Sequence, residues 1–306
     1  MLALFAAACV LVQPTPAAPT PPTAPAKPTR EDRYPTPTIT VIDAGRNPRP
    51  VRVSATKGDS WTQTWTIHGE EKATLDGVPR PAPPRVGDFT ATLKLEVVEG
   101  TGEGARVRWK VESARALPGA GASEAAKAAG EAAATAATGL AGELAVTDRG
   151  VMTDGTDGTP EQQAGELTAS LLRNWAWSCV PFPAEAVGVG GKWKAESTRK
   201  NESGALLRRA ATYEITALTQ TSVRLHVTGS STLEAQTAPQ GQRVKAVTVA
   251  ETSEIEYQLT RPVPAAADVT TETDAKFEST NTPKPVEFVI LRKKRIQIAE
   301  GAEGAK

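Results

Sequence analysis

The sequence contains very few of the side chains on which most catalytic and metal chemistry depends. Its 306 residues include two histidines and two cysteines. So few histidines limit zinc sites and histidine-based acid–base catalysis, and Cys9 and Cys179 lie in contexts too different for a disulfide framework. A Walker loop, a Rossmann glycine set, a G-x-S-x-G elbow and an HExxH motif are all missing. We therefore expect no enzyme activity, no catalytic residues, and no metal or cofactor.

An excess of charge of either sign is also missing. The chain has 35 basic and 35 acidic side chains and a net charge of zero. Nucleic-acid-binding proteins usually carry a basic excess, so we expect no nucleic-acid partner. The one basic run is Arg292–Arg295, in LRKKRIQI. Such a run can contact anionic lipid, but its apolar flanks favour a strand on which the charges block edge-to-edge pairing.

The N-terminus begins with an apolar run, MLALFAAACVLV. It is too short to span a bilayer, which needs ~20 residues, and it has the length of a signal-peptide core. Its AAAC resembles the lipobox of bacterial lipoproteins, in which the cysteine is acylated, although that motif carries leucine where Ala6 stands. We expect residues 1–12 to be a signal and anchor segment with lipid attached at Cys9. A plain secretory signal and a cytoplasmic tail are the alternatives.

Residues 13–38 are dense in proline, threonine and alanine and have almost no large apolar side chains. Such a segment cannot form a core and populates extended polyproline II. At about 3.1 Å per residue, some 25 residues reach roughly 75 Å. We therefore predict a disordered tether that holds a folded domain away from a membrane to which the acyl anchor binds. The location that follows is the bacterial cell envelope, in the periplasm or on the outer surface.

Residues 39–299 carry mostly alternating apolar and polar residues, which is typical of half-buried strands. In SWTQTWTIHG, Trp61 and Trp65 lie on one face and threonines on the other. Residues 50–55 also alternate, and short polar breaks throughout are typical of antiparallel meanders. We predict a single α+β domain, predominantly antiparallel β, built as a curved sheet or half-barrel. Residues 300–306 form a disordered tail in this interpretation.

Two stretches interrupt the strand pattern. Residues 122–139 are rich in alanine, which favours helix, but they lack an apolar stripe and contain Gly130. We expect a marginal, exposed helix or a flexible insert there. Residues 160–178 follow a Thr-Pro-Glu-Gln capping sequence, and Leu171 and Trp175 recur in them at helical spacing. This pattern predicts a docked helix.

A weak internal repeat runs through the domain. The motif Gly-x-x-Trp occurs at Gly58–Trp61 and at Gly190–Trp193, each time ahead of a pair of alternating segments. We therefore predict two related halves, residues 50–118 and 143–260, each with a glycine turn that leads into a tryptophan-bearing strand.

One order of motifs runs from GLAGELAVTDRGVM through the capped helix to VPFPAEAVGVGGKW and an alternating hairpin. This order resembles a family of uncharacterised bacterial envelope proteins, many of them lipoproteins, over roughly residues 50 to 260. A more distant, fold-level similarity is to lipoprotein-carrier-like proteins, which have a curved antiparallel sheet with a helix in its hollow. The resemblance implies a location and a fold, and no activity. The motif residues here are Asp148, Gly150, Pro183, Val187, Gly188, Gly190 and Trp193.

Cys179 lies in NWAWSCVPFPAEAVGVGGKW, the stretch richest in aromatic residues. A nucleophilic cysteine would need His68 or His226 beside it, and both alternate out of phase with the apolar face of their strands. Aromatic neighbours favour an unreactive thiol. We interpret this stretch as a corner between a helix and a strand, with Cys179 packed inside it.

Three aspartates, Asp148, Asp154 and Asp157, lie in TDRGVMTDGTDGTP and could ligate calcium. Their spacing does not fit an EF-hand, and Asp-Gly steps are common turn chemistry. A hydrolase that uses two carboxylates needs no sequence spacing, and no pair of acidic residues stands out here. These aspartates are therefore interpreted as turn residues.

The tryptophans are the remaining candidates for ligand contact. Six tryptophans in a β-rich domain either fill its core or line a cavity for an apolar ligand. We expect a non-catalytic binding module for an apolar small molecule or a lipid, and its protein partners are unknown. The alternative is a structural or protein-interaction domain of the envelope without a ligand pocket. The candidate ligand-binding residues are Trp175, Leu171, Trp193, Trp61 and Trp65.

Overall fold

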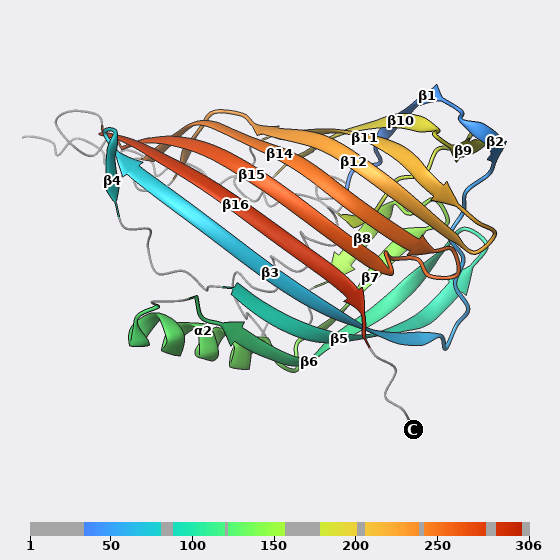
Figure 1. Cartoon of the computed structure of the whole chain (residues 1–306), viewed down its shortest axis with the longest axis horizontal. Coiled ribbons are helices and arrows are strands. Elements are labelled where there is room, and N and C mark those ends of the chain that lie inside the picture. Colours follow the sequence, from blue (N-terminus) through green and yellow to red (C-terminus); the bar gives the residue numbers. More distant parts are fainter. Residues whose placement is uncertain are drawn as a thin grey trace, which may run out of the picture.

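The structure, a computed structural model, describes residues 34–80, 88–119, 122–156, 178–200, 206–238, 242–279 and 286–301. Their main feature is one large, curved antiparallel sheet accompanied by a helix (Figure 1). The prediction of an α+β domain that is predominantly antiparallel β is confirmed. None of the helices in these ranges is long and apolar enough to cross a membrane.

The main sheet has 14 strands in the order β1-β10-β11-β12-β14-β15-β16-β3-β5-β6-β7-β8, with β13 added beside β14 and β4 beside β3. A separate two-stranded sheet pairs β2 with β9. The strands are β1 (Thr38–Asp43), β2 (Arg46–Arg49), β3 (Ser60–Leu75), β4 (Val78–Arg80), β5 (Asp88–Thr101), β6 (Gly104–Leu117), β7 (Ala141–Thr147), β8 (Met152–Thr156), β9 (Val187–Val189), β10 (Lys192–Lys200), β11 (Leu206–Leu218), β12 (Ser222–Leu233), β13 (Gln236–Ala238), β14 (Gln242–Gln258), β15 (Ala266–Ser279) and β16 (Val286–Glu300).

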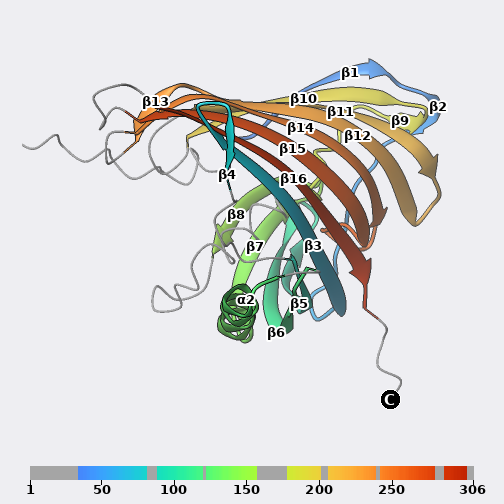
Figure 2. The same ribbon diagram turned by 60° about the vertical axis from the view of Figure 1, so that its left-hand side comes forward.

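The sheet bends round a hollow without closing, so that β1 and β8 form its two edges. Figure 2 shows β5, β6, β7 and β8 curling beneath the long strands β14, β15, β16 and β3. Long strands twist strongly, and bulges increase that twist. The β5–β6 pair has two register shifts, between Thr92 and Leu93 and between Val97 and Glu99.

Side chains of the inner face of the sheet form one hydrophobic core. Trp65, Trp109 and Trp193 are fully buried there. The alternation of residues 50–55 predicts a further strand, but this segment does not form one. Its valines are buried in the core, while its backbone bonds single residues of different elements, as in the bond from Val53 N to the Asp148 carbonyl at 2.7 Å. The side chains of residues 50–55 are therefore alternately buried although the segment pairs with no strand.

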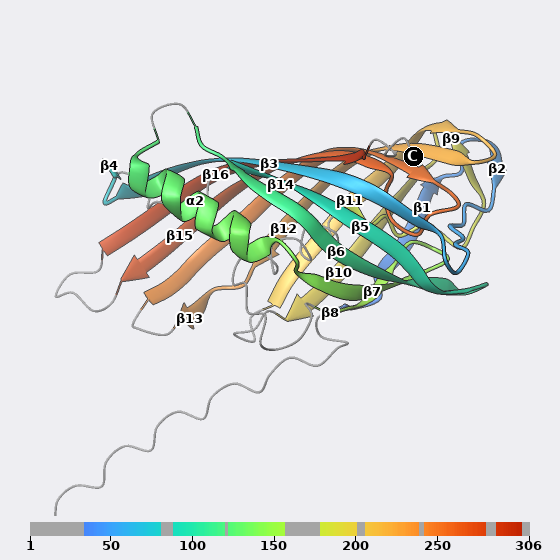
Figure 3. The same cartoon turned by 90° about the horizontal axis from the view of Figure 1, so that it is seen from below.

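The alanine-rich stretch forms α2 (Glu124–Ala137), which begins at the N-cap Ser123 and packs along β6 (Figure 3). The predicted helix is confirmed, and Gly130 has a role in it that the sequence did not indicate. Gly130 is buried, and a Cβ atom placed on it would lie 3.1 Å from the Cβ of Ala116 on β6. The missing side chain lets helix and sheet approach closely, and Ala134 and Ala137 are buried on the same face of the helix.

Both predicted glycine turns adopt the left-handed backbone conformation that favours glycine. Gly58 has φ of 94° and Gly190 has φ of 81°. Each turn leads into a strand whose tryptophan, Trp61 or Trp193, is buried. The division of the domain into two related halves remains a prediction.

The basic run Arg292–Arg295 lies on β16, which is an interior strand between β15 and β3. The expectation that these charges protect an edge is therefore wrong, because an interior strand has no open edge. Successive residues point to opposite faces, and each face supplies acidic partners. Arg292 pairs with Glu71 at 2.6 Å, and Lys293 pairs with Glu272 at 3.2 Å. Basic side chains of this run therefore form ion pairs with acidic side chains of the two neighbouring strands.

The predicted helix at residues 160–178 lies outside the described residues except for Ser178. The anchor segment with Cys9, and the tether as far as residue 33, lie outside them as well.

Candidate functional site

The candidate site is a half-open cavity of about 100 Å³ at the seam between the two edges of the sheet. On one side, residues Tyr34, Pro35 and Pro37 precede β1, and on the other side Val151 and Met152 enter β8. The Tyr34 hydroxyl donates a hydrogen bond to the Gly155 carbonyl at 3.3 Å and so connects the two sides. The end of the proline-rich stretch is thus part of the cavity wall.

The floor of the cavity is made by β10 and β11. Side chains two residues apart share one face of a strand, so Ser197 and Arg199 of β10 point the same way as Leu207 and Arg209 of β11. The register places Ser197 opposite Arg209 and Arg199 opposite Leu207. Two arginines therefore stand among smaller and apolar side chains.

The roof is the turn after β7 together with the segment that follows Ser178. Gly150 in this turn has φ of 73°, and a Cβ atom on it would lie 2.3 Å from the Val180 carbonyl oxygen. The Phe182 amide donates to the Arg149 carbonyl at 2.8 Å, and Arg149 Nε donates back to the Phe182 carbonyl at 2.9 Å. Only glycine allows this close approach of the two segments.

Arg209 forms a buried ion pair with Glu251 of β14. Arg209 Nη2 lies 2.9 and 3.2 Å from the two carboxylate oxygens, and the Ser253 hydroxyl donates to Glu251 Oε1 at 3.1 Å. The Glu251 side chain is fully buried, and that of Arg209 is 18% exposed. Burial alone would lower the pKa of Arg209, but the neighbouring Tyr213 and Glu251 outweigh it and raise that pKa. Arg209 is therefore a fixed positive charge.

The pair is possible because β12, which lies between β11 and β14, carries Gly229 at this level. Gly229 is opposite Ala211 on one side and Glu251 on the other. A Cβ atom on Gly229 would lie 3.4 Å from Glu251 Oε2. The glycine leaves room for the two charged side chains to meet across the intervening strand.

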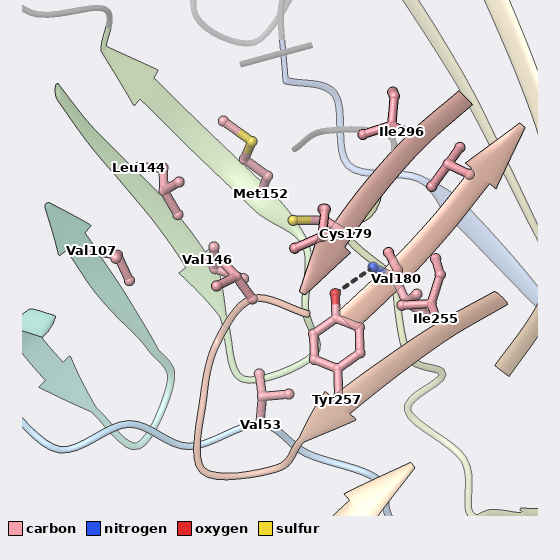
Figure 4. Close-up of a cluster of buried hydrophobic side chains, with 14 of the residues drawn as sticks. Val53, Val107, Leu144, Val146, Met152, Cys179, Val180, Ile255, Tyr257 and Ile296 are labelled. Atoms are coloured by element: carbon pink, nitrogen blue, oxygen red, sulfur yellow. Dashed lines mark hydrogen bonds between the residues drawn. The ribbon is translucent and has the colours of Figure 1, made fainter. Parts of the chain in front are cut away.

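Cys179 is buried and lines the cavity roof, and Figure 4 shows it within a cluster of buried side chains that includes Met152 and Val180. Burial raises its pKa to about 12, although a hydrogen bond with Tyr257 and the charge of Arg209 oppose this. Tyr257 is itself held by the chain, since its hydroxyl accepts from the Val180 amide at 2.9 Å and donates to the Ser178 carbonyl at 3.4 Å. Nucleophilic chemistry uses the thiolate, which is not present here at neutral pH.

The two histidines lie on the opposite face of the sheet, as their alternation predicted. His68 Nδ1 lies 2.7 Å from Asp88 Oδ2, and His226 Nδ1 lies 2.6 Å from Glu254 Oε1. Both side chains are at least one-third exposed, at 45% and 37%. Neither histidine lines the cavity with Cys179.

Of the tryptophans proposed for ligand contact, Trp61, Trp65 and Trp193 are buried in the core. Trp193 stacks on Tyr213 with ring centroids 5.4 Å apart, and its Nε1 donates to the Pro181 carbonyl at 2.8 Å. Trp65 is fully buried, and Trp61 lies beneath the Arg261 guanidinium at 5.5 Å. Trp193 thus supports a cavity wall from behind. Leu171 and Trp175 lie outside the described residues.

Asp148, one of the three clustered aspartates, forms an ion pair with Arg52 at 3.3 Å. Asp154 accepts a hydrogen bond from the Gly155 amide at 2.9 Å, as expected of a turn or strand-end residue. Asp157 is outside the described residues. Within the part of the chain that the structure describes, no group of three potential ligands could hold a metal ion.

The buried pair of Arg209 in the cavity floor and Glu251 behind it was missed from the sequence, although a signal was present. Arg209 is in phase with Tyr213 and Ile215 on the apolar face of its strand, and Glu251 is in phase with Ile255 on its own strand. A charge at a core position is unusual unless it is paired. Two such positions of opposite sign on nearby strands point to a buried pair.

No family model and no curated protein matches the sequence. Among solved structures, the chain is similar to an outer membrane channel from Pseudomonas putida F1 at 7% sequence identity. That match covers 82% of this chain and 98% of the channel, with a TM-score of 0.21. A similarity at this level indicates no function for this chain.

Proposed function

We propose that the protein is an exported, lipid-anchored protein of the bacterial cell envelope that acts as a non-catalytic binding module for an apolar ligand such as a lipid. The observation that supports binding is the cavity at the seam of the sheet. Most of its wall is apolar, as in small-molecule sites. Its volume of about 100 Å³ is smaller than that of a pocket that encloses a whole small molecule, so it would receive only part of a ligand. The apolar lining residues include Pro35, Pro37, Val151, Met152, Pro181 and Leu207.

The absence of catalysis in this proposal follows from the titratable groups of the cavity. A general acid or base works best with a pKa near the operating pH. The pKa of Cys179 is raised to about 12, and that of Tyr213 is raised by burial despite the charge of Arg209. Arg209 itself stays protonated beside Glu251. These groups hold their charges fixed near neutral pH, which suits binding.

The location in this proposal rests on the sequence. An apolar N-terminal run with AAAC, followed by a proline-rich tether, is the arrangement of a lipid-anchored domain. Acylation of Cys9 is tested by growing expressing cells with a labelled fatty acid. Label on the wild type that is lost in Cys9→Ser supports the anchor, and an unlabelled wild type overturns it.

A second candidate is a structural or interaction domain without a ligand. The observation that favours it is the solid packing of the core, in which Trp65, Trp109 and Trp193 are fully buried. In that case the cavity would be a packing defect without a ligand, and the protein would act by binding partners through the surface of its sheet.

Mass spectrometry of lipids extracted from the protein purified from a bacterial envelope, in a form without its anchor, separates the two candidates. We expect a reproducible co-purifying lipid on the wild type and on Leu291→Glu, which lies outside the cavity and is 49% exposed. We expect the lipid to be lost from Leu207→Glu, in the cavity floor, with an unchanged circular dichroism spectrum. A lipid-free wild type would support the second candidate.

A further inference from the structure

We infer that the hydrocarbon chain of the ligand lies along a row of apolar side chains on the inner face of the sheet, which begins at Leu207 in the cavity floor and ends at Ala73 on β3. The inference rests on the binding function proposed above and extends its site. It starts from the size of the cavity, which at about 100 Å³ is well below the roughly 300–1,000 Å³ of a pocket that encloses a small molecule. The rest of a long apolar ligand therefore needs an apolar surface that continues from the cavity.

The register of the sheet provides such a surface. Residues directly opposite each other on paired strands point to the same face, so the partners of Leu207 extend the cavity floor from strand to strand. Each of the next five strands places an apolar side chain at this level. The row is formed by Leu207 of β11, Leu233 of β12, Val247 of β14, Ala275 of β15, Ile290 of β16 and Ala73 of β3.

The row is separate from the hydrophobic core. None of its six members is among the described residues that form the core or pack against it. Two residues along each strand, on the side of the core, a parallel row is mostly polar or charged. That second row is formed by Arg209, Ser231, Val249, Thr273, Arg292 and Glu71. Its charged side chains, among them Arg292 and Glu71 at 2.6 Å from each other, repel a hydrocarbon chain. Packing in the core thus does not explain the apolar row.

The other side of the row is apolar as well. Phe277, Phe288 and Leu75 lie two residues from the row on β15, β16 and β3, and they are cross-strand partners in that order. Phe288 is 38% exposed. A hydrocarbon chain on the row would contact these side chains and remove their apolar surface from water, which favours binding in proportion to the area buried.

The length of the row fits one long hydrocarbon chain. Neighbouring strands are about 4.8 Å apart, so a row that crosses six strands is roughly 24 Å long. The chains of a membrane lipid span half of the bilayer core, which is about 15 Å. One such chain therefore fits on the row with one end in the cavity. The polar end lies in the cavity, because the cavity wall contains Ser197, Arg199 and Arg209 and the row contains only apolar side chains.

Isothermal titration of the full chain carrying Cys9→Ser, with hexanol, octanol and decanol as probes, tests this inference. The three alcohols have the same neutral head group and differ only in chain length. We expect the affinity to rise by about fourfold for each added methylene group up to decanol, since burial of one such group has this value. A chain confined to the cavity would gain nothing once the cavity is full.

A charge placed in the row tests the path of the chain. Val247→Glu should weaken decanol binding at least about tenfold, because a hydrocarbon chain avoids an unpaired charge. It should leave hexanol binding unchanged, because the shorter chain ends before this position. The matched control is Thr248→Glu, which adds the same charge at an exposed position on the opposite face of the same strand. The control should bind all three alcohols like the protein without this substitution.

Photolabelling maps the whole row and does not depend on the folding of a row variant. The probes are two hexadecanol analogues, which carry a diazirine either at carbon 3 or at carbon 15. We expect the first to label β10 or β11 and the second to label β15, β16 or β3.

The outcomes separate the row from the cavity. Decanol that binds no more tightly than hexanol would overturn the inference and leave a ligand site in the cavity. Equal decanol affinities of Val247→Glu and Thr248→Glu, or a carbon-15 label confined to residues 157–177, would overturn the assigned path. A dimer that Val247→Glu converts into a monomer would make the row an interface between two copies, and the inference would be wrong. An absence of binding by all three alcohols would overturn both the inference and the proposed function.

Discussion

Tyr34 and Gly155 lie 121 residues apart in the chain, yet the tyrosine hydroxyl donates a hydrogen bond to the glycine carbonyl at 3.3 Å. The two residues belong to opposite sides of the seam, one before β1 and the other on β8. An edge strand carries backbone groups that no neighbouring strand satisfies. This bond therefore uses a carbonyl of an edge strand to bring the two sides of an unclosed sheet together, directly beside the cavity.

We expect Tyr34→Phe to loosen the seam while preserving the ring. The loss of one hydrogen bond, worth about 1 kcal/mol, should speed hydrogen exchange of the β8 amides several-fold, and the amides of the interior strand β12 serve as the internal control. Gly155→Ala should act in the same direction, because a Cβ atom there would lie 2.7 Å from the Tyr34 hydroxyl oxygen. Unchanged exchange at β8 in both variants would show that the bond does not hold the seam.

The Arg209–Glu251 pair predicts a large effect from a small substitution. Glu251→Gln leaves the Arg209 charge buried without its counter-charge, and breaking such a pair costs about 3–5 kcal/mol. Urea unfolding should show this loss in the free energy of unfolding. Glu254→Gln is the matched control, since Glu254 is 65% exposed, and it should change the free energy by less than about 0.5 kcal/mol.

The double substitution Arg209→Met with Glu251→Met completes this test. Replacing both members of a buried pair with apolar side chains of similar size is often neutral. We therefore expect the double variant to recover most of the stability that Glu251→Gln loses. A double variant as unstable as the single one would mean that the two charges do not act as a pair.

Much of the fold could be predicted because its signals are local. Alternation of period two identifies strands from neighbouring residues, and alanine content identified α2. The neighbours of each strand could not be predicted in the same way, because pairing joins distant segments. β16 joins β3 through pairs such as Phe288 with Leu75, and no feature of LRKKRIQI identifies that partner. The basic run was consequently assigned to an edge.

The cavity was harder to predict than the fold for the same reason. Its wall combines residues before β1, in the turn after β7, and on β10 and β11, and no two of these segments are adjacent in the sequence except β10 and β11. The tryptophans were proposed for ligand contact because of their size, and Trp61, Trp65 and Trp193 are buried in the core, as large aromatic side chains often are. The residues that indicated the site were Arg209 and Glu251, which are charged but alternate with the buried residues of their strands.

The close approach of α2 to β6 predicts that replacing Gly130 with a residue that has a large side chain destabilises the protein. Gly130→Leu would place a side chain where a Cβ atom already lies 3.1 Å from Ala116, and overpacking of this kind costs about 1–3 kcal/mol. Ala132→Leu makes a similar change on the exposed side of the same helix and should change stability by less than about 0.5 kcal/mol. Thermal unfolding of the two variants measures the difference. Equal melting temperatures would contradict the close packing of this helix.

The buried thiol of Cys179 predicts a loss of stability in alkali. Burial raises its pKa from an ordinary 9.0 to about 12 in the folded protein, with smaller opposing effects of Tyr257 and Arg209. Between these values the unfolded chain has lost the thiol proton and the folded chain has kept it. Stability therefore falls as pH rises above about 9, and this contribution is present in full at lower pH.

The comparison of the wild type with Cys179→Ser isolates this contribution, because the serine hydroxyl does not ionise in the range. Tyr213 and Tyr257 also have raised pKa values, first through burial and with a smaller contribution from Cys179, and their burial is common to both proteins. From pH 9 upward, the free energy of unfolding of the wild type should fall by an additional ~1.4 kcal/mol per pH unit relative to the variant. Parallel curves over pH 9 to 10.5 would show that the thiol ionises at the same pH in the folded and unfolded chain, and that solvent reaches the cavity roof.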